Sequence, residues 1–347
     1  MLYGKISING YKQLVTSGFI LRLRMVSMTL VLLLLSLNNV FAQNKRMVAI
    51  GSSTTAGYIT TSPDSSWFGR FSKYYKCRVS IMDSSLNFGV SGAGVYTGMP
   101  TGCLPPPGRP NPDMAKNVSK AVAVMQSLAS PEDGVIIVNY PSNQYNIYSI
   151  AEIMNCLQLI YDSATVSGNL CFITTTQPRT DSLFDNSAMK KKLADIKDST
   201  LNRFGVAHTI NFWDGMYNPV DTTILPIYSA GDQIHFNDAG HRVLFERILA
   251  KNVFSLPAWY AAPHGNLNLL TSWGANADGT GRHPAGFAIN NQVFIITNNP
   301  TPTINANWTI SGKNVQLIVG DGIKPVSFKI PAGFRVTVSN PPPSACK

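Results

Sequence analysis

Two patterns of apolar and polar residues alternate along the chain between residues 46 and 256. Short continuous apolar runs, bounded by glycine, proline or polar turn residues, are typical of strands that are buried on both faces. Longer segments between these runs repeat their apolar positions with the period of a helix. The sequence therefore predicts strands at 48–50, 77–82, 134–139, 169–175 and 206–211, and helices at 66–75, 113–128, 147–163, 183–204 and 238–254.

This alternation predicts an α/β domain, with a parallel sheet that is covered by helices on both faces. After Pro257 the helical period disappears, and short β-like runs separated by Asn, Gly and Pro take its place. They predict a small all-β module, such as a sandwich or a solenoid fragment, and leave open whether it is complete. We therefore expect one domain at 43–256 and a second at 257–347, with β-runs at Val293–Thr297, Trp308–Ser311, Val315–Val319, Val326–Ile330 and Phe334–Val338.

The first 42 residues have the layout of a secretory signal peptide. Arg22 and Arg24 precede an apolar stretch at 28–37, and a small-residue cleavage pattern ends at Ala42. The apolar stretch is shorter than the about 20 residues of a bilayer-spanning helix, which makes an uncleaved anchor the less favoured alternative. We predict that residues 1–42 are removed, that the protein is secreted to the extracellular space or the periplasm, and that it has no stable membrane insertion afterwards.

The composition is that of a globular protein, with 44% hydrophobic and 13% charged residues. The formal net charge is +10, but the leader contributes four basic residues and no acid, so the remainder carries +6. One short basic run, Lys190–Lys192, is typical of a solvated helix face. Nucleic-acid binding is therefore not expected.

Five cysteines are present: Cys77, Cys103, Cys156, Cys171 and Cys346. Export permits disulfides, but the number is odd and the spacing predicts no particular pairing. Cys156 and Cys171 lie in apolar runs, which are typical of buried free thiols. No cysteine or histidine spacing indicates metal ligands, and no phosphate-binding loop is present, so neither a metal nor a cofactor is expected.

Polar residues gather where the predicted strands end. Ser53 follows the first strand, Gly92 follows the second, and Asn143 follows the strand at 134–139. Asp232 and His235 stand immediately before the last helix. In an open parallel sheet the carboxyl ends of the strands form one edge, and ligands bind there. We therefore expect these side chains to lie close together.

These residue types can together perform acyl transfer. A serine becomes a nucleophile only when a base removes its proton, and histidine titrates in the range that this task needs. A carboxylate such as Asp232 orients the histidine and stabilises the imidazolium. Loop amides at Ser53 and Gly92, with the side chain of Asn143, can stabilise the developing oxyanion. The predicted triad is Ser53, Asp232 and His235.

The order of these segments resembles the four blocks of the SGNH hydrolase superfamily, also called GDSL esterases and lipases. The blocks are Gly51-Ser52-Ser53, Asn87-x-Gly89-x-Ser91-Gly92, Asn143 and Asp232-x-x-His235, and the resemblance spans about residues 46–252. It implies a flavodoxin-like, three-layer α/β/α fold and a metal-free serine esterase. It also implies that Ser53 is the nucleophile, His235 the base, Asp232 the orienting acid, and that Ser53, Gly92 and Asn143 form the oxyanion hole.

The sequence departs from the family pattern at two places. The usual Gly-Asp-Ser is Gly51-Ser52-Ser53 here, without an acid beside the nucleophile. The usual Gly-x-Asn-Asp is Pro141-Ser142-Asn143-Gln144, which keeps the amide but lacks the glycine and the aspartate. Every catalytic role stays filled, while the surroundings of the nucleophile and of the oxyanion loop differ.

Three residues outside these blocks also have expected roles. Asn237 is expected to cap the helix at 238–254, and His241 is expected to pack within it. His208 lies in the predicted strand at 206–211 and is expected to be a core histidine.

The residues therefore predict a secreted serine esterase that removes an acyl group, most simply acetyl, from an extracellular carbohydrate through an acyl-enzyme. The substrate would be an acylated small molecule or polysaccharide. A lipase or short-chain esterase is the enzymatic alternative, and a large apolar patch near Ser53 would favour it. A non-catalytic glycan-binding or adhesion protein, whose function lies in residues 257–347, is the third possibility. The oligomeric state stays open.

Overall fold

The computed structural model describes residues 45–79, 81–128, 130, 133–140, 142–181, 186–321, 323 and 326–339. The predicted leader at 1–42 and Cys346 lie outside these residues. No helix in the described part has both the length and the hydrophobicity that crossing a bilayer requires.

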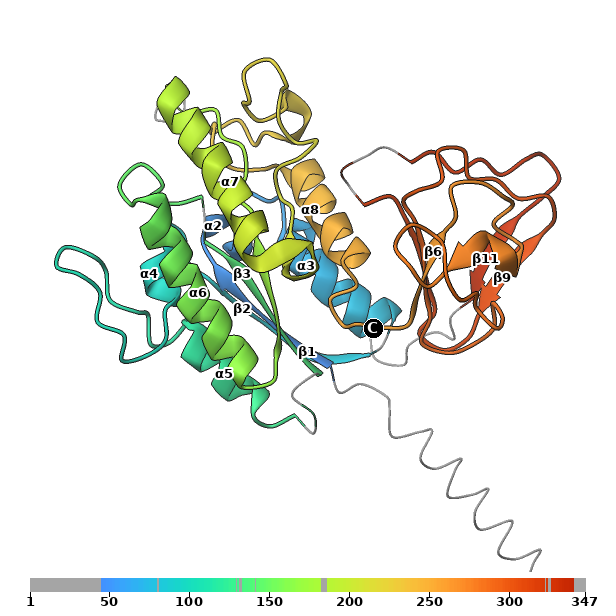
Figure 1. The fold of residues 1–347 in the computed structure, drawn as a ribbon, viewed down its shortest axis with the longest axis horizontal. Helices are drawn as coiled ribbons and strands as arrows, with labels where there is room; N and C mark the ends of the chain where they lie inside the picture. The colour runs from blue at the N-terminus through green and yellow to red at the C-terminus, as the bar shows by residue number, and fades with distance from the viewer. Residues whose placement is uncertain are drawn as a thin grey trace, which may run out of the picture. The chain divides into compact units, whose positions relative to one another are not determined.

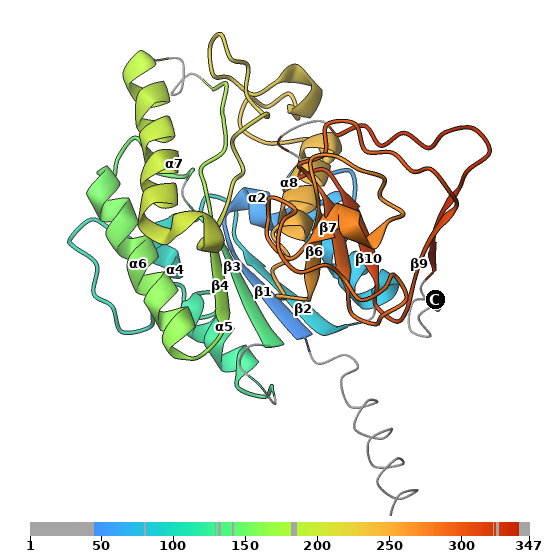
Figure 2. The ribbon, with the colours of Figure 1, turned by 45° about the vertical axis from the view of Figure 1, so that its right-hand side comes forward.

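Five parallel strands form the central sheet, in the order β2-β1-β3-β4-β5. Figure 2 shows β4, β3, β1 and β2 side by side in this order. This is the strand order of flavodoxin-like folds, in which the chain reverses its direction of progress beside β1. The bounds are β1 Lys45–Gly51, β2 Met82–Gly89, β3 Gly134–Asn139, β4 Leu170–Thr174 and β5 Thr209–Ile210.

Helices cover both faces of this sheet, which confirms the predicted three-layer α/β/α class (Figure 1). Val48 and Ile50 of β1 contact one helical layer, and Met47 and Ala49 contact the other. All four side chains are fully buried because successive residues of a strand point to opposite faces. The first layer contains α5 Val118–Met125, α6 Ile150–Val166 and α7 Ser187–His208, and the second contains α3 Trp67–Lys73 and α8 Asp238–Ala250.

Short helical turns connect these elements. Two are single α-helical turns, α2 Ser53–Ala56 and α4 Val95–Gly98. The others are the 3-10 turns Pro63–Ser65, Pro226–Tyr228 and Leu270–Ser272 and the π-helical turn Tyr74–Arg78. The proline-rich segment at 100–112 is a loop.

The strand predicted at 77–82 is wrong. The π-helical turn Tyr74–Arg78 extends α3, and β2 begins only at Met82. The ring of Tyr75 packs against Phe71 and Phe254, with centroid distances of 4.6 and 4.9 Å, which favours the helical extension. β2 is an edge strand that pairs only with β1, so its serines and Asn87 stay partly exposed and resemble a loop in sequence.

The prediction for His208 is also wrong. His208 is the last residue of α7 and is exposed, and β5 contains only Thr209 and Ile210. The apolar residues Phe204 and Val206 near it belong to the end of α7. Phe204 is buried and Val206 is exposed, whereas a buried strand would cover both. The start predicted for this helix at 183 lies outside the described residues.

The C-terminal region contains two small sheets. Strands β8 Val293–Ile296, β9 Trp308–Ser311 and β10 Gln316–Val319 agree with prediction to within a residue, and β11 Val336–Ser339 is shorter than expected. The run at 326–330 is not a strand. Two strands, β6 Ala258–Ala261 and β7 Trp273–Gly274, were not predicted.

The pairing in this region is that of a solenoid rather than of a sandwich. β6, β8 and β10 pair in parallel in one sheet, and β9 and β11 pair in parallel in the other. From β8 to β11 the chain alternates between the two sheets and enters each sheet again in the same direction, whereas β7 runs antiparallel to β6. Asn291 and Asn314 occupy equivalent positions of successive coils, both with positive φ, and their side chains hydrogen-bond at 2.7 Å.

The C-terminal region shares a hydrophobic core with the α/β domain. Val293, Ile295 and Ile318 pack in the same cluster as residues of α3 and α8. Tyr74 Oη also hydrogen-bonds Gln316 Oε1 at 3.1 Å. A separate module linked by a flexible connection would leave these apolar side chains exposed, so the two predicted parts stabilise each other.

We expect residues 43–256 alone to be much less stable than residues 43–347. Truncation removes Val293, Ile295 and Ile318 from the shared core, and three buried side chains contribute more than about 4 kcal/mol to the free energy of unfolding. Thermal melting followed by circular dichroism would measure the difference. Equal melting temperatures for the two proteins would contradict the shared core.

A point substitution gives the same test without truncation. Ile295→Ala removes a fully buried side chain and should cost about 2–4 kcal/mol. Val319→Ala is the matched control, because Val319 is 41% exposed and its loss should change stability by less than about 0.5 kcal/mol.

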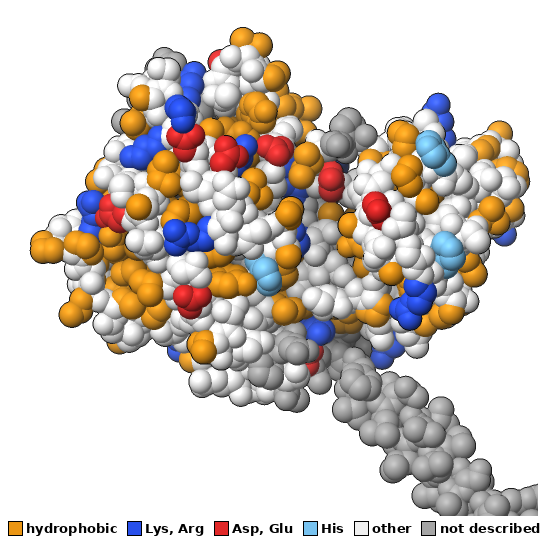
Figure 3. Space-filling model, viewed as in Figure 1, with side chains coloured by type: hydrophobic (Ala, Val, Ile, Leu, Met, Phe, Trp, Pro, Cys, Tyr) orange, Lys and Arg blue, Asp and Glu red, His pale blue; other side chains and the backbone are white. Residues whose placement is uncertain are grey.

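Charged side chains of both signs are interspersed on the face that Figure 3 shows. Lys and Arg stand there among Asp and Glu, with hydrophobic and uncharged side chains between them. Exposed ion pairs such as Lys73 with Asp64 and Lys191 with Asp195 have the same character. Such pairs contribute little to stability.

Candidate active site

Ser53 lies at the carboxyl edge of the sheet, where β1 passes directly into α2. The turn requires glycine at position 51, because a Cβ there would lie 2.2 Å from Thr55 Oγ1 and 2.6 Å from the Asn139 carbonyl oxygen. The Ser52 amide donates to that same carbonyl at 3.1 Å, which ties the turn to β3. As the first helical residue, Ser53 has an amide that the helix does not use. Ser53 is only 6% exposed.

The structure brings together Ser53, His235 and Asp232, which are up to 182 residues apart. Ser53 Oγ lies 2.8 Å from His235 Nε2, and His235 Nδ1 hydrogen-bonds Asp232 Oδ2. Because the carboxylate accepts the Nδ1 proton, Nε2 carries a lone pair that faces the serine hydroxyl. The arrangement can therefore remove the proton of Ser53.

Asp232 also organises its own loop. Its Oδ1 accepts the amides of Ile234 and His235 at 3.1 and 2.8 Å. Between them, Gln233 has φ of 70°, a left-handed conformation that costs energy for a residue other than glycine. This tight turn lets the aspartate reach a histidine only three residues away.

The carboxylate of Asp232 is kept charged. Burial raises its pKa, but hydrogen bonds from the His235 ring and from the two backbone amides outweigh burial, so the pKa lies below its usual value. A negative carboxylate at neutral pH stabilises the imidazolium that forms when His235 takes a proton.

The two loops beside Ser53 contain Gly92 and Asn143, the residues that the sequence predicts as oxyanion donors. β1 lies between β2 and β3, so the loops that follow these two strands flank Ser53 on either side. Gly92 has φ of 80°, a conformation that favours glycine. Asn143 Nδ2 donates one hydrogen to the Ala93 carbonyl at 2.8 Å. An amide nitrogen has two hydrogens, so one remains for an oxyanion.

Gln144, which replaces the aspartate of the family pattern, contacts the same turn. Its Nε2 donates to the Gly92 carbonyl oxygen at 2.9 Å. A carboxylate could not donate at this place. Because residue 144 is glutamine here, a side-chain amide holds the Gly92 carbonyl in place.

Asn87 supports the turn that carries Ser53. Its Nδ2 donates to the Thr55 carbonyl at 2.8 Å, at the end of α2. Its Oδ1 accepts the Gly89 amide at 2.8 Å. The first residues of this block thus fasten α2 to the end of β2.

The loop after β4 was not predicted to belong to the site. Gln177 accepts a hydrogen bond from Thr54 Oγ1 at 2.8 Å and donates to the Ile234 carbonyl at 3.2 Å. One buried side chain thus connects the residue after Ser53 to the residue before His235. The sequence feature that could have identified this loop is its position, because residues 175–181 are a polar run that follows a buried strand.

The same loop braces the two other loops of the site. Arg179 and Asp181 form a buried two-point ion pair, with N–O distances of 2.8 and 2.9 Å. Arg179 Nη1 also donates to the Ser142 carbonyl at 3.1 Å, beside Asn143. The Thr180 amide donates to the Gln233 carbonyl at 2.7 Å, inside the Asp232 turn.

Tyr58 is a second site residue that sequence reasoning missed. Its ring lies edge-on to the ring of His235, with a centroid distance of 4.8 Å and an interplanar angle of 61°. Tyr58 is 50% exposed, whereas His235 is 8% exposed. An isolated aromatic residue in a loop gives no sequence signal for this contact.

Asn237 and His241 have the expected capping and packing roles. Asn237 Oδ1 accepts the Gly240 amide at 3.0 Å and caps α8. His241 Nδ1 accepts the Trp67 amide at 3.2 Å. Burial lowers the pKa of His241 to about 4, so its ring is neutral at neutral pH.

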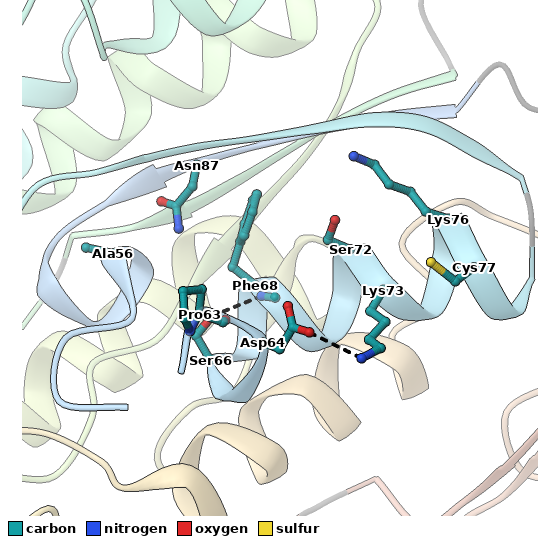
Figure 4. Close-up of a pocket in the computed structure, with 11 residues that line it drawn as sticks. Ala56, Pro63, Asp64, Ser66, Phe68, Ser72, Lys73, Lys76, Cys77 and Asn87 are labelled. Atoms are coloured by element: carbon teal, nitrogen blue, oxygen red, sulfur yellow. Dashed lines mark hydrogen bonds and ion pairs between the residues drawn. The ribbon is translucent and has the colours of Figure 1, made fainter. Parts of the chain in front are cut away.

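A cavity of about 690 Å³ lies beside the edge strand, and its wall includes Ala56, Phe68, Lys73 and Asn87 (Figure 4). Neither it nor the cavities of about 680 and 230 Å³ elsewhere in the described part has Ser53, Asp232 or His235 in its wall. Among the described residues, no group of three or more His, Cys, Asp or Glu side chains is placed to hold a metal ion.

Solved structures similar to this one are lipolytic proteins and esterases. A member of the lipolytic protein G-D-S-L family from Veillonella parvula is 16% identical, and the match covers 59% of this chain and 96% of that one, with a TM-score of 0.42. A GDSL-like lipase from Bacteroides thetaiotaomicron is 13% identical over 63% and 94%, with a TM-score of 0.43. A two-domain esterase active on acetylated mannans is 16% identical over 62% and 50%, with a TM-score of 0.39. No family model and no curated protein matches the chain.

Proposed function

We propose that this chain is a secreted serine esterase of the SGNH type, which removes acetyl groups from an extracellular carbohydrate through an acyl-enzyme. The observation that carries the proposal is the hydrogen-bonded series Ser53, His235 and Asp232 at the carboxyl edge of the sheet. The turns that flank Ser53 contain Gly92 and Asn143, and one hydrogen of the Asn143 amide is not used by the Ala93 carbonyl, which supports their assignment as oxyanion donors.

In the acylation step, Ser53 Oγ attacks the carbonyl carbon of the ester while its proton passes to His235 Nε2. The carbonyl oxygen becomes an oxyanion and accepts hydrogen bonds from the Ser53 and Gly92 amides and from Asn143. When this intermediate collapses, the bond to the alcohol oxygen breaks and His235 Nε2–H protonates that oxygen. The acyl group remains on Ser53 Oγ.

In the second step a water molecule takes the place of the alcohol. His235 Nε2 removes a proton from the water, and the water oxygen attacks the acyl carbon. Collapse breaks the bond to Ser53 Oγ, which regains a proton from His235, and the carboxylic acid leaves. In both steps the charged Asp232 stabilises the imidazolium.

Two observations support export. Residues 1–42 have the pattern of a signal peptide. Cys77 is disulfide-bonded, and disulfides persist mainly in oxidising compartments such as the extracellular space or the periplasm.

The surroundings of Ser53 support a small acyl group and a polar alcohol. Gln144 and the exposed Ser91 stand at the Gly92 turn, and the half-exposed Tyr58 stands at His235. A long acyl chain needs an apolar cleft, whereas the groups named here beside Ser53 and His235 are an amide, a hydroxyl and a half-exposed phenol.

Purified residues 43–347 would be tested for acetate release from acetylated xylan, and for hydrolysis of chromogenic acetate and palmitate esters. Release of acetate that disappears in Ser53→Ala supports the proposal. Faster hydrolysis of palmitate would instead favour the lipase. Absence of turnover on every ester, with no labelling of Ser53 by a serine-directed phosphonate, would favour a binding protein.

Replacement of Asn143 by alanine should lower kcat by about 10²–10³-fold and leave KM nearly unchanged, because its amide stabilises charge that exists only in the transition state. Asn146→Ala is the matched control, since Asn146 is an exposed amide in the same loop. Steady-state kinetics on a chromogenic acetate would measure both. A loss confined to KM would contradict the oxyanion role of Asn143.

A further inference from the structure

We propose that Tyr58 contacts the alcohol part of the substrate and favours a pyranose ring at that position. This inference rests on the proposed esterase function and extends it to the choice of alcohol. It assigns substrate selection to a residue outside the four sequence blocks.

The chemistry places the alcohol beside His235. His235 Nε2 must reach the oxygen of the departing alcohol to protonate it. The carbonyl oxygen must meanwhile point toward the donors at Gly92 and Asn143. The ester therefore lies with its alcohol on the histidine side of Ser53, and Tyr58 is the aromatic residue that packs against His235 there.

Tyr58 is held in this place at several points. Its amide donates to the Ser53 carbonyl at 3.0 Å, so its backbone is tied to the nucleophile itself. Beyond it, Thr61 donates from its amide and its hydroxyl to the two carboxylate oxygens of Asp238, at the start of α8. The segment that carries Tyr58 is thus fastened both to the nucleophile turn and to the helix that follows His235.

The backbone of this segment is also strained. Ile59 has φ of 65°, and a β-branched residue in the left-handed region is a true outlier. Such conformations cost of order 1–3 kcal/mol and cluster at functional sites, where the surrounding contacts maintain them. Here the maintained conformation keeps the Tyr58 ring against His235.

The exposure of Tyr58 suits contact with a ligand. Half of its surface is free, while Ser53 and His235 beside it are 6% and 8% exposed. The ring therefore offers apolar surface next to a recessed pair of reacting groups. The face of an aromatic ring is electronegative, and the C–H groups along one side of a pyranose are apolar and weakly positive, so the two can stack.

A different role for Tyr58 would be to shield the His235–Asp232 pair from water. Shielding would affect every ester equally, because the pair acts in every reaction. Contact with the alcohol would affect only esters whose alcohol is large enough to reach the ring. The two roles therefore differ in how the effect depends on the alcohol.

The experiment compares kcat/KM for two acetates, glucopyranose pentaacetate and methyl acetate. Tyr58→Ala should lower kcat/KM for the sugar acetate by about tenfold, mainly through KM, and change that for methyl acetate by less than about twofold. Tyr58→Phe retains the ring and should keep both values within about twofold of wild type. Ile147→Ala is a control, since Ile147 is an exposed apolar residue on the loop after β3.

An equal loss on both acetates, or no loss on either, would overturn the role of Tyr58 while hydrolysis by the wild type still supports the esterase. If the wild type hydrolyses neither acetate faster than Ser53→Ala, the esterase function fails, and the inference about Tyr58 fails with it. Melting temperatures of the variants would exclude loss of the fold as the cause.

Discussion

Hydrolysis of an acetate ester should fall by about 10⁶-fold when Ser53 is replaced by alanine. The Ser53 oxygen is the atom that forms the bond to the acyl carbon, and the side chain of alanine cannot form it. The remaining rate would come from water attack assisted by the oxyanion donors, which Ser53→Ala leaves in place.

The fold should survive this substitution. Ser53 Oγ contacts His235 Nε2, and removal of one hydroxyl leaves no cavity of significant size. Ser52→Ala is the matched control, because Ser52 is equally buried and its side chain makes no capping hydrogen bond to α2. The control should keep both activity and melting temperature. Substantial activity in Ser53→Ala, or its loss in Ser52→Ala alone, would contradict the assignment of the nucleophile.

Covalent labelling gives a second readout of the same prediction. A serine-directed phosphonate requires an activated hydroxyl, so the wild type should gain one adduct at Ser53 that mass spectrometry of peptides can locate. Ser53→Ala should gain none. An adduct on another serine would identify a different nucleophile.

Replacement of His235 by alanine should cost about 10⁶-fold in kcat, and Asp232→Asn about 10⁴-fold. Without His235 the hydroxyl of Ser53 has no base within reach. In Asp232→Asn the oxygen can still accept the backbone amides of Ile234 and His235, which preserves the turn. The amide nitrogen would then face His235 Nδ1 and donate to it, which places the ring proton on Nε2, where it opposes catalysis.

Steady-state kinetics of both variants on a chromogenic acetate would check this order. Asp221→Asn is the control, since Asp221 is an exposed carboxylate in the same long loop and its oxygen Oδ1 hydrogen-bonds Thr223. The double variant Ser53→Ala/His235→Ala should be no slower than Ser53→Ala, because residues that act as a unit are not additive. A greater loss for Asp232→Asn than for His235→Ala, or wild-type rates in both, would contradict the proposed roles.

The secondary-structure predictions that were wrong concern segments whose residues are only partly buried. β2 reads as a loop around Asn87 because an edge strand tolerates polar residues on its exposed side. The segment 77–82 reads as a strand although its first part, Cys77 and Arg78, belongs to a π-helical turn packed on Phe254. Local patterns identify elements reliably when both faces are buried, and less so at an edge.

The parallel sheet and the residues of the proposed catalytic series could be predicted from local patterns in the chain. Central strands such as Gly134–Asn139 are buried on both faces and therefore consist mainly of apolar residues. A short segment of sequence is enough to recognise such a run. Asp232 and His235 are three residues apart, so their partnership is also local. Parallel strands then bring every strand-end loop to one edge, whatever the details of packing.

The contacts that support the site could not be predicted in this way, because they join residues that are distant along the chain. Gln177 joins Thr54 to Ile234, and Tyr58 packs on His235, across separations of 57 to 177 residues. Val293 and Ile295 of the C-terminal region likewise pack in the core of the α/β domain. Each contact depends on which strands are neighbours and on how their loops fold over the carboxyl edge of the sheet. The periodicity of apolar residues along the chain contains no information about either.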